Sequence, residues 1–171
     1  KRRPDRFDII TFGAEPYGHY NRILLSNVLN QSQPAAEITM NPLSWYKENN
    51  IKLHAGIKAV CIDRENKIVL GKRITNGKDA YMPIPTDLPE GTATREPYDF
   101  LILATGSRPF VPPMEGFGGT GTFLFRTIDD CTGIAEYAKK SRKAVVIGGG
   151  LLGLEAARGL ITHDVDVTVV E

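Results

Sequence analysis

The sequence is short of cysteine, of net charge and of long apolar runs, and each shortage excludes a class of protein. Its two cysteines, Cys61 and Cys131, form neither a C-x-x-C pair nor a metal-ligand spacing, which excludes a disulfide-stapled secreted scaffold. Lys and Arg number 21 and Asp and Glu 20, so the clustered basic surface of a nucleic-acid binder is not expected. No apolar run approaches the roughly 20 residues of a membrane span, and the basic residues 1–6 lead into a strand-like run rather than a signal peptide. We therefore expect a globular, cytoplasmic protein that binds neither nucleic acid nor membrane.

The length fits more than one domain arrangement. A chain of 171 residues corresponds, at about 150 residues per domain, to one domain or to parts of two. The share of hydrophobic residues, 42%, is enough to build a core. The chain starts without Met and stops at Glu171, at the end of an apolar run. We therefore expect a portion that is cut at both ends.

The N-terminal half predicts short strands and helices. Residues 7–12 (FDIITF) form an apolar, β-branched run before Gly13, which predicts a buried strand. The Asn41-Pro42 pair indicates a helix that starts with Asn41 as N-cap and runs to about residue 49. We also expect a short helix over residues 22–29, strands over 51–53, 57–63 and 67–70, and a hairpin turn over 64–66. Residues 71–97, rich in Gly, Pro, Thr and charge, predict an inserted surface loop.

The C-terminal half predicts an α/β arrangement. Residues 99–104 (DFLILA) form a continuous apolar run that is typical of a central parallel strand. After a proline-rich connector, residues 123–125 predict a short strand and residues 128–140 a helix with two acids in its first turn. The last part predicts a βαβ unit over residues 144–171, with a strand at 144–147, a helix at 151–160 and a strand at 165–170.

A glycine cluster inside that βαβ unit carries the strongest signal. Gly148-Gly149-Gly150-Leu151-Leu152-Gly153 fits G-x-G-x-x-G between a strand and a helix, and the next strand ends in an acid, Glu171. Such glycines permit a tight turn, a close pyrophosphate and close helix–strand packing, while the helix N-terminus supplies amide donors. Glu171 would accept hydrogen bonds from a ribose and repel a 2′-phosphate, so NADH is favoured over NADPH. The alternative is a glycine-rich turn that only packs.

Two further features point to a second nucleotide site. Glu15 follows the strand predicted at residues 7–12, as the acid of a βαβ unit does, and its glycine fingerprint would lie about 20 residues earlier, before residue 1. An ordinary surface-loop acid is the alternative for Glu15. The turn at residues 104–109 (ATGSRP) follows the predicted strand 99–104, at the strand end where open α/β sheets bind ligands.

Five segments in order resemble the large subunit of NAD(P)H-dependent nitrite reductases, within the pyridine nucleotide–disulfide oxidoreductase superfamily. These segments are YNRILLS (20–26), NPLSWYKENNIKLHAG (41–56), LATGSRPFVPP (103–113), FRTIDD (125–130) and VVIGGGLLGLEAARGL (145–160). The resemblance covers nearly the whole chain apart from the predicted loop.

The resemblance implies a flavoprotein built from two dinucleotide-binding domains with a small antiparallel β portion. Residues 1–112 would form a partial FAD-binding domain that lacks its first strand and glycine fingerprint, and residues 113–171 would begin an inserted NAD(P)-binding domain. Electrons would pass from NAD(P)H to FAD and then to iron–sulfur and sirohaem centres in a part of the parent protein not contained in this sequence.

The resemblance also assigns site residues. Those implied for FAD are Glu15, Asn21, Arg22, Ser26, Val60, Ala104, Thr105, Gly106 and Arg108. Those implied for NAD(P) are Gly148, Gly149, Gly150, Leu151, Leu152, Gly153 and Glu171. Glu155 matches an acid near the nicotinamide and flavin, often paired with a Lys, and is the catalytic candidate; its alternative is a helix acid beside Arg158.

The sequence departs from its relatives at two points. Asn27 stands where many flavin reductases have the Lys that pairs with the acid, and this weakens an ion-pair role for Glu155. The redox cysteine pair is absent, so reduction of a disulfide substrate is not expected. His19, His54 and His163 have no partner at ligand spacing, and no metal site is expected.

These observations predict an electron-entry part of a nitrite reductase. Its partners would be a nicotinamide dinucleotide, the rest of the parent polypeptide and a small subunit, with a homo-oligomer left open. One alternative is an FAD-dependent NAD(P)H reductase of a ferredoxin- or rubredoxin-like carrier. Another is a folded, non-catalytic fragment that does not retain flavin.

Overall fold

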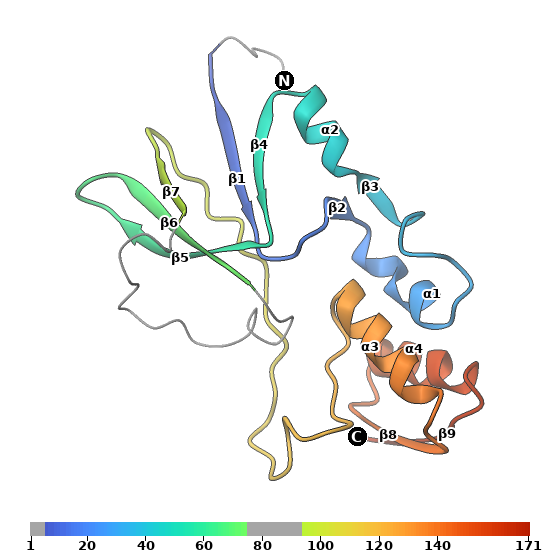
Figure 1. Cartoon of the computed structure of the whole chain (residues 1–171). Coiled ribbons are helices and arrows are strands. Elements are labelled where there is room, and N and C mark those ends of the chain that lie inside the picture. The colour runs from blue at the N-terminus through green and yellow to red at the C-terminus, as the bar shows by residue number, and fades with distance from the viewer. Residues whose placement is uncertain (1–5, 75–93) are drawn as a thin grey trace. The chain divides into compact units, whose positions relative to one another are not determined.

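The computed structural model describes residues 6–74 and 94–171 (Figure 1). The chain forms two compact units: unit 1 contains Lys1–His19 and Asn41–Arg108, and unit 2 contains Tyr20–Met40 and Pro109–Glu171. Residues 20–40 thus share a unit with the C-terminal part of the chain. The predicted division at residues 112 and 113 concerns cofactor binding, and it stays a prediction.

A parallel strand pair forms one part of unit 1. Strand β1 (Ile9–Gly13) pairs in parallel with β4 (Ile51–Ala55), so that Ile9 faces Ile51 and Gly13 faces Ala55. Parallel strands need a crossover connection, and helix α2 (Leu43–Glu48) lies in the segment that leads into β4. The strands predicted at 7–12 and 51–53 and the helix predicted from residue 42 form, but no residue of β1 is buried, so the burial predicted for residues 7–12 is wrong.

The start of α2 differs from the prediction. Its N-cap is Pro42, while Asn41 ends strand β3 (Thr39–Asn41), which pairs with β2 (His19–Tyr20). The Asn41 side chain is used elsewhere, because its Oδ1 lies 3.1 Å from His19 Nδ1. Asn41 therefore does not cap the helix.

The second part of unit 1 is an antiparallel sheet in the order β5-β6-β7. Strands β5 (Ile57–Asp63) and β6 (Ile68–Arg73) form the predicted hairpin, whose turn is held by Asn66 N donating to Asp63 Oδ1 at 3.0 Å. Strand β7 (Thr94–Pro97) pairs with β6, and both β7 and the last residues of β6 lie inside the segment 71–97 predicted as a loop, so that prediction is wrong at both ends. Residues 75–93 of the predicted loop lie outside the described residues.

Two predicted strands do not form. Residues 99–104 and 123–125 have no strand conformation, and Phe100 and Ile102 are 82% and 87% exposed. A strand needs hydrogen-bond partners for its backbone, and in the described ranges β1 and β4 pair only with each other. The apolar run at 99–104 therefore has the composition of a central strand without the pairing.

Unit 2 packs three α-helices and a short 3₁₀ helix, η1, beside a second parallel strand pair. Its elements are η1 (Arg22–Leu24), α1 (Leu25–Leu29), α3 (Ile128–Ala138), β8 (Lys143–Ile147), α4 (Leu151–Ile161) and β9 (Asp166–Val170). The helix predicted at 128–140 is confirmed, and its capping box joins Thr127 and Asp130. Buried side chains of α1 and α3, including Leu25, Leu29 and Cys131, form the core. The predicted strand–helix–strand unit is confirmed by β8, α4 and β9, with β8 parallel to β9.

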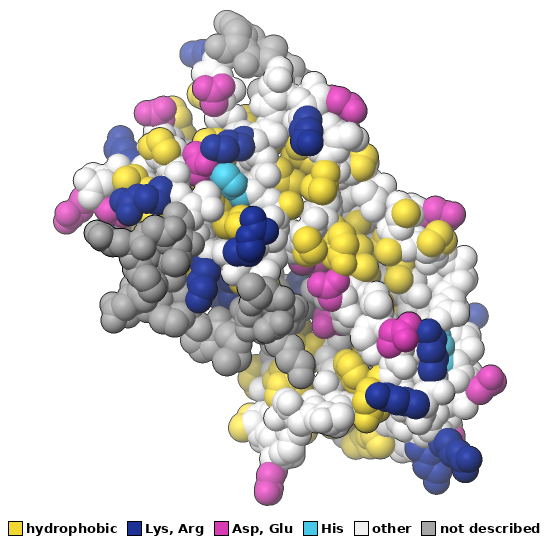
Figure 2. Space-filling view, viewed as in Figure 1, with side chains coloured by type: hydrophobic (Ala, Val, Ile, Leu, Met, Phe, Trp, Pro, Cys, Tyr) yellow, Lys and Arg dark blue, Asp and Glu magenta, His cyan; other side chains and the backbone are white. Residues whose placement is uncertain are grey.

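Charge is distributed in both signs over the face shown in Figure 2. Basic and acidic side chains are interspersed there, with apolar side chains exposed between them. Within the described residues, no helix is long and apolar enough to cross a membrane.

Candidate functional site

The glycine turn between β8 and α4 is built as the sequence predicts. Gly148 has a φ of +107°, in the region that favours glycine, and its N–H donates to the Val170 carbonyl at 2.7 Å. Gly150 is the N-cap of α4, and its carbonyl accepts from Leu154 N at 3.0 Å. The turn thus carries the chain from the end of β8 directly into the first turn of α4.

The space around the glycines separates their roles. A Cβ on Gly153 would collide with the Gly148 carbonyl oxygen, so glycine there allows the helix to lie against the turn. A Cβ on Gly150 would meet no atom within 4 Å. This open approach to a helix N-terminus, where backbone N–H groups carry partial positive charge, fits the pyrophosphate of a dinucleotide.

Glu171 lies beside this turn. Its carboxylate Oε2 accepts a hydrogen bond from Gly149 N at 2.5 Å. Glu171 follows the end of β9 and Gly149 follows the end of β8, and these two strands pair in parallel. The side chain is exposed, and its second oxygen can accept further hydrogen bonds. The structure therefore brings the predicted ribose acid together with residues 148–153, although ribose binding by Glu171 stays a prediction.

Glu155 occupies the second turn of α4. It is half-buried, and Ala156 and Ala157 next to it are buried in unit 2. Leu151 and Leu152, at the start of the same helix, are exposed. These positions agree with a helix whose N-terminus is open to a ligand, and the catalytic assignment of Glu155 stays a prediction.

The residues predicted to hold FAD are divided between the two units. Glu15, Val60, Ala104, Thr105, Gly106 and Arg108 belong to unit 1, and Asn21, Arg22 and Ser26 belong to unit 2. Residues 104–108 have no regular structure, and Gly106 has a φ of +69°, which requires glycine or strain. The Glu15 carbonyl accepts from Gly56 N at 2.9 Å, which ties the end of β1 to the end of β4.

Val60 has a backbone feature that suits its predicted role. The register of β5 and β6 shifts between Ala59 and Cys61, so Val60 is the extra residue of a β-bulge. A bulged residue leaves the regular ladder of hydrogen bonds, and its backbone groups can then serve another partner. No pattern in the sequence indicates this bulge, but the contact predicted for Val60 is a backbone contact.

In unit 2, Asn21 and Arg22 have roles in the structure of the protein itself. Asn21 Oδ1 accepts from Ile23 N at 3.1 Å and caps η1. Arg22 Nη1 donates to Tyr20 Oη at 2.8 Å and to the Arg126 carbonyl at 3.0 Å, and its guanidinium lies 4.8 Å from the centre of the Tyr20 ring. These contacts hold the guanidinium in one orientation.

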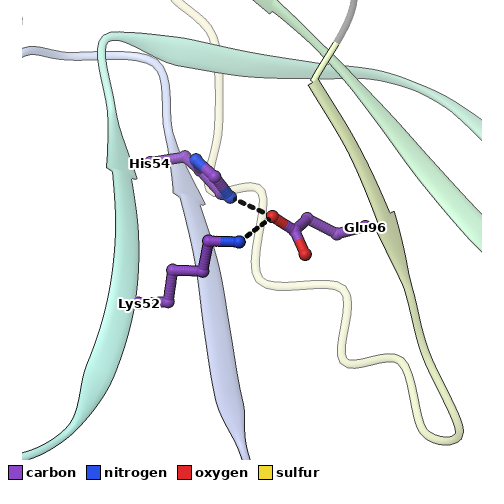
Figure 3. A network of polar contacts seen from close by, with 3 residues as sticks. All are labelled: Lys52, His54 and Glu96. Atoms are coloured by element: carbon purple, nitrogen blue, oxygen red, sulfur yellow. Dashed lines mark hydrogen bonds and ion pairs between the residues drawn. The ribbon is translucent and has the colours of Figure 1, made fainter.

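Sequence reasoning missed a polar network in unit 1. Glu96 Oε1 lies 2.5 Å from Lys52 Nζ and 2.6 Å from His54 Nε2, and Figure 3 shows both side chains pointing from β4 to the Glu96 carboxylate on β7. Burial would raise the pKa of Glu96, but the hydrogen bonds and charges of Lys52 and His54 outweigh it and lower the pKa. Lys52 and His54 lie two positions apart on one face of β4, and this spacing can be read from the sequence. Glu96, in contrast, falls within the loop predicted over residues 71–97.

The histidines of units 1 and 2 contact groups other than a metal site in the part of the chain that the structure describes. Within the described ranges, no three His, Cys, Asp or Glu side chains come together in a way that could hold a metal ion. His54 is stacked on Phe12, with ring centroids 5.0 Å apart, and His163 Nε2 lies 2.7 Å from the Leu29 carbonyl oxygen. Both histidines thus pack within their own units.

Comparisons with known proteins extend these observations. Over 167 residues the chain is 46% identical to nitrite reductase (NAD(P)H) of Bacillus subtilis (strain 168), covering 97% of this chain and 18% of that protein. It is 33% identical over 165 residues to the nitrite reductase (NADH) large subunit of Escherichia coli (strain K12), covering 96% of this chain and 17% of the relative. The chain therefore spans less than a fifth of the length of these curated relatives.

Solved structures share the fold. An NAD-dependent persulfide reductase from A. fulgidus superposes with a TM-score of 0.80 at 28% identity, over 98% of this chain and 30% of that chain. The family model described as pyridine nucleotide-disulphide oxidoreductase matches residues 2–171. With its parallel strand pairs, its small antiparallel sheet and its glycine turn, the chain belongs to the pyridine nucleotide-disulphide oxidoreductase family and has the family's FAD/NAD-binding, Rossmann-like α/β fold.

Proposed function

We propose that this chain is the electron-entry part of an NAD(P)H-dependent nitrite reductase. The support is the identity to nitrite reductases over nearly the whole chain, together with the geometry of the glycine turn. The turn is the observation that carries the proposal, because it combines an open helix N-terminus with an acid at the end of the next strand. A cytoplasmic location is part of the proposal.

Residues 148–153 would bind the nicotinamide dinucleotide. The N-terminal amides of α4 would donate to the pyrophosphate, which can approach because Gly150 has no side chain and faces open space. Glu171 would accept the ribose hydroxyls, and its negative charge would repel a 2′-phosphate. NADH is therefore the favoured donor.

Glu15 and Val60, both in unit 1, are two of the residues that would hold FAD. Glu15 would accept hydrogen bonds from the FAD ribose, and the backbone of Val60 would meet the adenine at its bulge. Bound flavin supplies the chemistry that accepts hydride from the nicotinamide and passes electrons toward the iron–sulfur and sirohaem centres proposed elsewhere in the parent protein. Glu155, half-buried on α4, would lie near the nicotinamide.

The substitution Gly150→Val tests the dinucleotide site. The side chain would fill the space needed by the pyrophosphate, and we expect NADH affinity to fall at least a hundredfold. A Cβ at this position meets no atom within 4 Å, and the melting temperature of the variant, measured beside that of the wild-type chain, serves as the folding control. NADH affinity that does not change would remove the glycine turn from the proposal.

A visible spectrum separates catalysis from the non-catalytic alternative. The chain is incubated with FAD, desalted and then mixed with NADH. A flavin band that survives desalting and bleaches with NADH supports the proposal. Complete loss of the band supports a folded piece that does not retain flavin by itself.

A carrier reductase is the second candidate, because NADH:rubredoxin oxidoreductase from Clostridium acetobutylicum superposes with a TM-score of 0.73 at 25% identity. The full-length polypeptide that contains this sequence would be supplied with NADH and either nitrite or oxidised rubredoxin. Nitrite-dependent NADH oxidation supports the first candidate. Oxidation that depends on rubredoxin alone supports the second.

A further inference from the structure

Gly149 is the one glycine of the Gly148–Gly150 run whose need for glycine is not yet explained. Gly148 has the left-handed φ, and Gly150 faces open space. The φ of Gly149 lies outside the left-handed region, so its backbone would accept any L-residue. A side chain here would displace Glu171, because a Cβ on Gly149 would come too close to the carboxylate oxygen that its own N–H binds, and the exposed Glu171 side chain would have to move away.

We propose that Gly149 is a positioning residue that holds the Glu171 carboxylate ready for the cofactor's ribose and thereby sets the choice of NADH over NADPH. This inference rests on the proposed binding of NAD(P)H at the glycine turn. Gly149 contributes in two ways: its N–H donates to Oε2, and its missing side chain leaves the carboxylate room to approach.

Glu171 has an exposed side chain, whose conformational freedom affects the free energy of ligand binding. A glutamate at the end of a strand can adopt many rotamers, and binding a ligand would then cost the entropy of choosing one. The Gly149 amide fixes one carboxylate oxygen before the ligand arrives, and the remaining lone pairs can accept ribose hydroxyls. A 2′-phosphate would meet a negative charge that must give up its hydrogen bond to Gly149 N before it can turn away, and this strengthens discrimination against NADPH.

A double-mutant cycle tests this role in the full-length polypeptide. The variants are Gly149→Ala, Glu171→Ala and the two combined, and the measured quantity is the ratio of kcat/KM for NADH to kcat/KM for NADPH. We expect Gly149→Ala to lower the ratio about tenfold, the effect of losing a charge-assisted hydrogen bond. In the Glu171→Ala background the same change should have little effect, because no carboxylate remains to be displaced.

The matched control is Gly133→Ala on α3. A Cβ there makes an ordinary contact of 3.6 Å with the Phe123 ring and lies outside the glycine turn. Gly133→Ala should leave the ratio unchanged. If Gly149→Ala lowers the ratio equally with and without the Glu171 carboxylate, Gly149 acts directly on the ligand or the fold, and the inference is overturned.

The amide signal of Gly149 gives a second readout that needs no turnover and no substitution at Gly149. In the ¹⁵N-labelled chain, the Gly149 amide proton should resonate downfield and move upfield in Glu171→Ala. A signal that does not move overturns the Gly149 contact alone. An amide signal that moves while Glu171→Ala leaves the NADH/NADPH ratio unchanged overturns the ribose role of Glu171, and with it both the proposed NADH site and the specificity role of Gly149.

Discussion

Two carboxylates in this protein are held in opposite ways. Glu96 in unit 1 is 9% exposed and lies against two side chains that can carry positive charge, Lys52 and His54. Glu171 in unit 2 is exposed and is held by one backbone N–H. Oε1 of Glu96 already contacts both Lys52 Nζ and His54 Nε2 and so links β7 to β4. Glu171, in contrast, keeps acceptor capacity for a ligand. The comparison shows how their surroundings engage one carboxylate fully within the fold and leave the other with the free acceptor capacity that its proposed ribose role requires.

Removing Glu96 should have the largest effect on stability. Glu96→Ala removes both charge-assisted contacts of the carboxylate and leaves the partly buried His54 ring without its acceptor, and we expect the free energy of unfolding to fall by about 2 kcal/mol. Urea denaturation measures this change. The control is Lys52→Met, which should cost less than about 1 kcal/mol because the Lys52 side chain is 58% exposed. Equal costs for the two variants would contradict the structural role of Glu96.

Replacing Glu171 should change function with little change in stability. Glu171→Arg removes the repulsion of a 2′-phosphate, and we expect the NADH/NADPH ratio of kcat/KM to fall by more than tenfold. Steady-state kinetics on the full-length polypeptide measure the ratio, and a melting curve of the same variant controls for folding. A ratio that does not move would mean that Glu171 does not contact the ribose.

The pH dependence of stability should report the contacts of Glu96 with Lys52 and His54. The folded pKa of Glu96 is lowered from its usual 4.5, so the unfolded chain binds the proton first as the pH falls. The contribution of Glu96 to the free energy of unfolding is therefore complete above pH 4.5. It is lost as the pH falls through the pKa that Glu96 has in the folded protein, which lies below 4.5. The difference in unfolding free energy between wild type and Glu96→Gln should shrink over this window. Parallel curves from pH 7 to pH 3 would contradict this prediction.

The two cysteines also differ in their surroundings, since Cys131 is buried and Cys61 is exposed. Burial, with a smaller contribution from Asp130, raises the pKa of Cys131 to about 12, and its Sγ lies 3.6 Å from the Leu25 carbonyl oxygen. Cys61 is exposed on β5. At pH 8, iodoacetamide should modify Cys61 and leave Cys131 unmodified until the chain unfolds, as peptide mass spectrometry can show. Modification of Cys61 should barely change the melting temperature.

Two apolar runs show how far the sequence could predict the fold. Residues 144–147 and 99–104 both have the composition of a buried parallel strand, but only the first forms a parallel strand, as part of β8, and no residue of β8 is buried. Strand β8 has β9 to pair with, and a glycine turn that delivers the chain into the packing helix. Composition reports the tendency to be buried, and it cannot report whether a pairing partner is present.

The candidate site shows the same limit. The glycine turn and Glu171 were predictable because their spacing is local, within one βαβ unit. The Lys52–His54–Glu96 network joins residues more than 40 positions apart, 42 for His54 and Glu96, and depends on the pairing of β7. Val60 was predicted by resemblance, but the bulge that releases its backbone depends on the register of β5 against β6.

The contact between α4 and α1 has a consequence for the order in which the protein folds. A Cβ on Gly159 would lie 2.7 Å from the Leu29 side chain, and His163 binds the Leu29 carbonyl across 134 positions of sequence. Residues 20–40 leave the ribosome early but complete their unit only after α4 has been made. At about 5–20 residues per second this interval is on the order of 10 s. Leu25 and Leu29 would remain exposed during that time, so chaperone capture during synthesis should concentrate on this early segment.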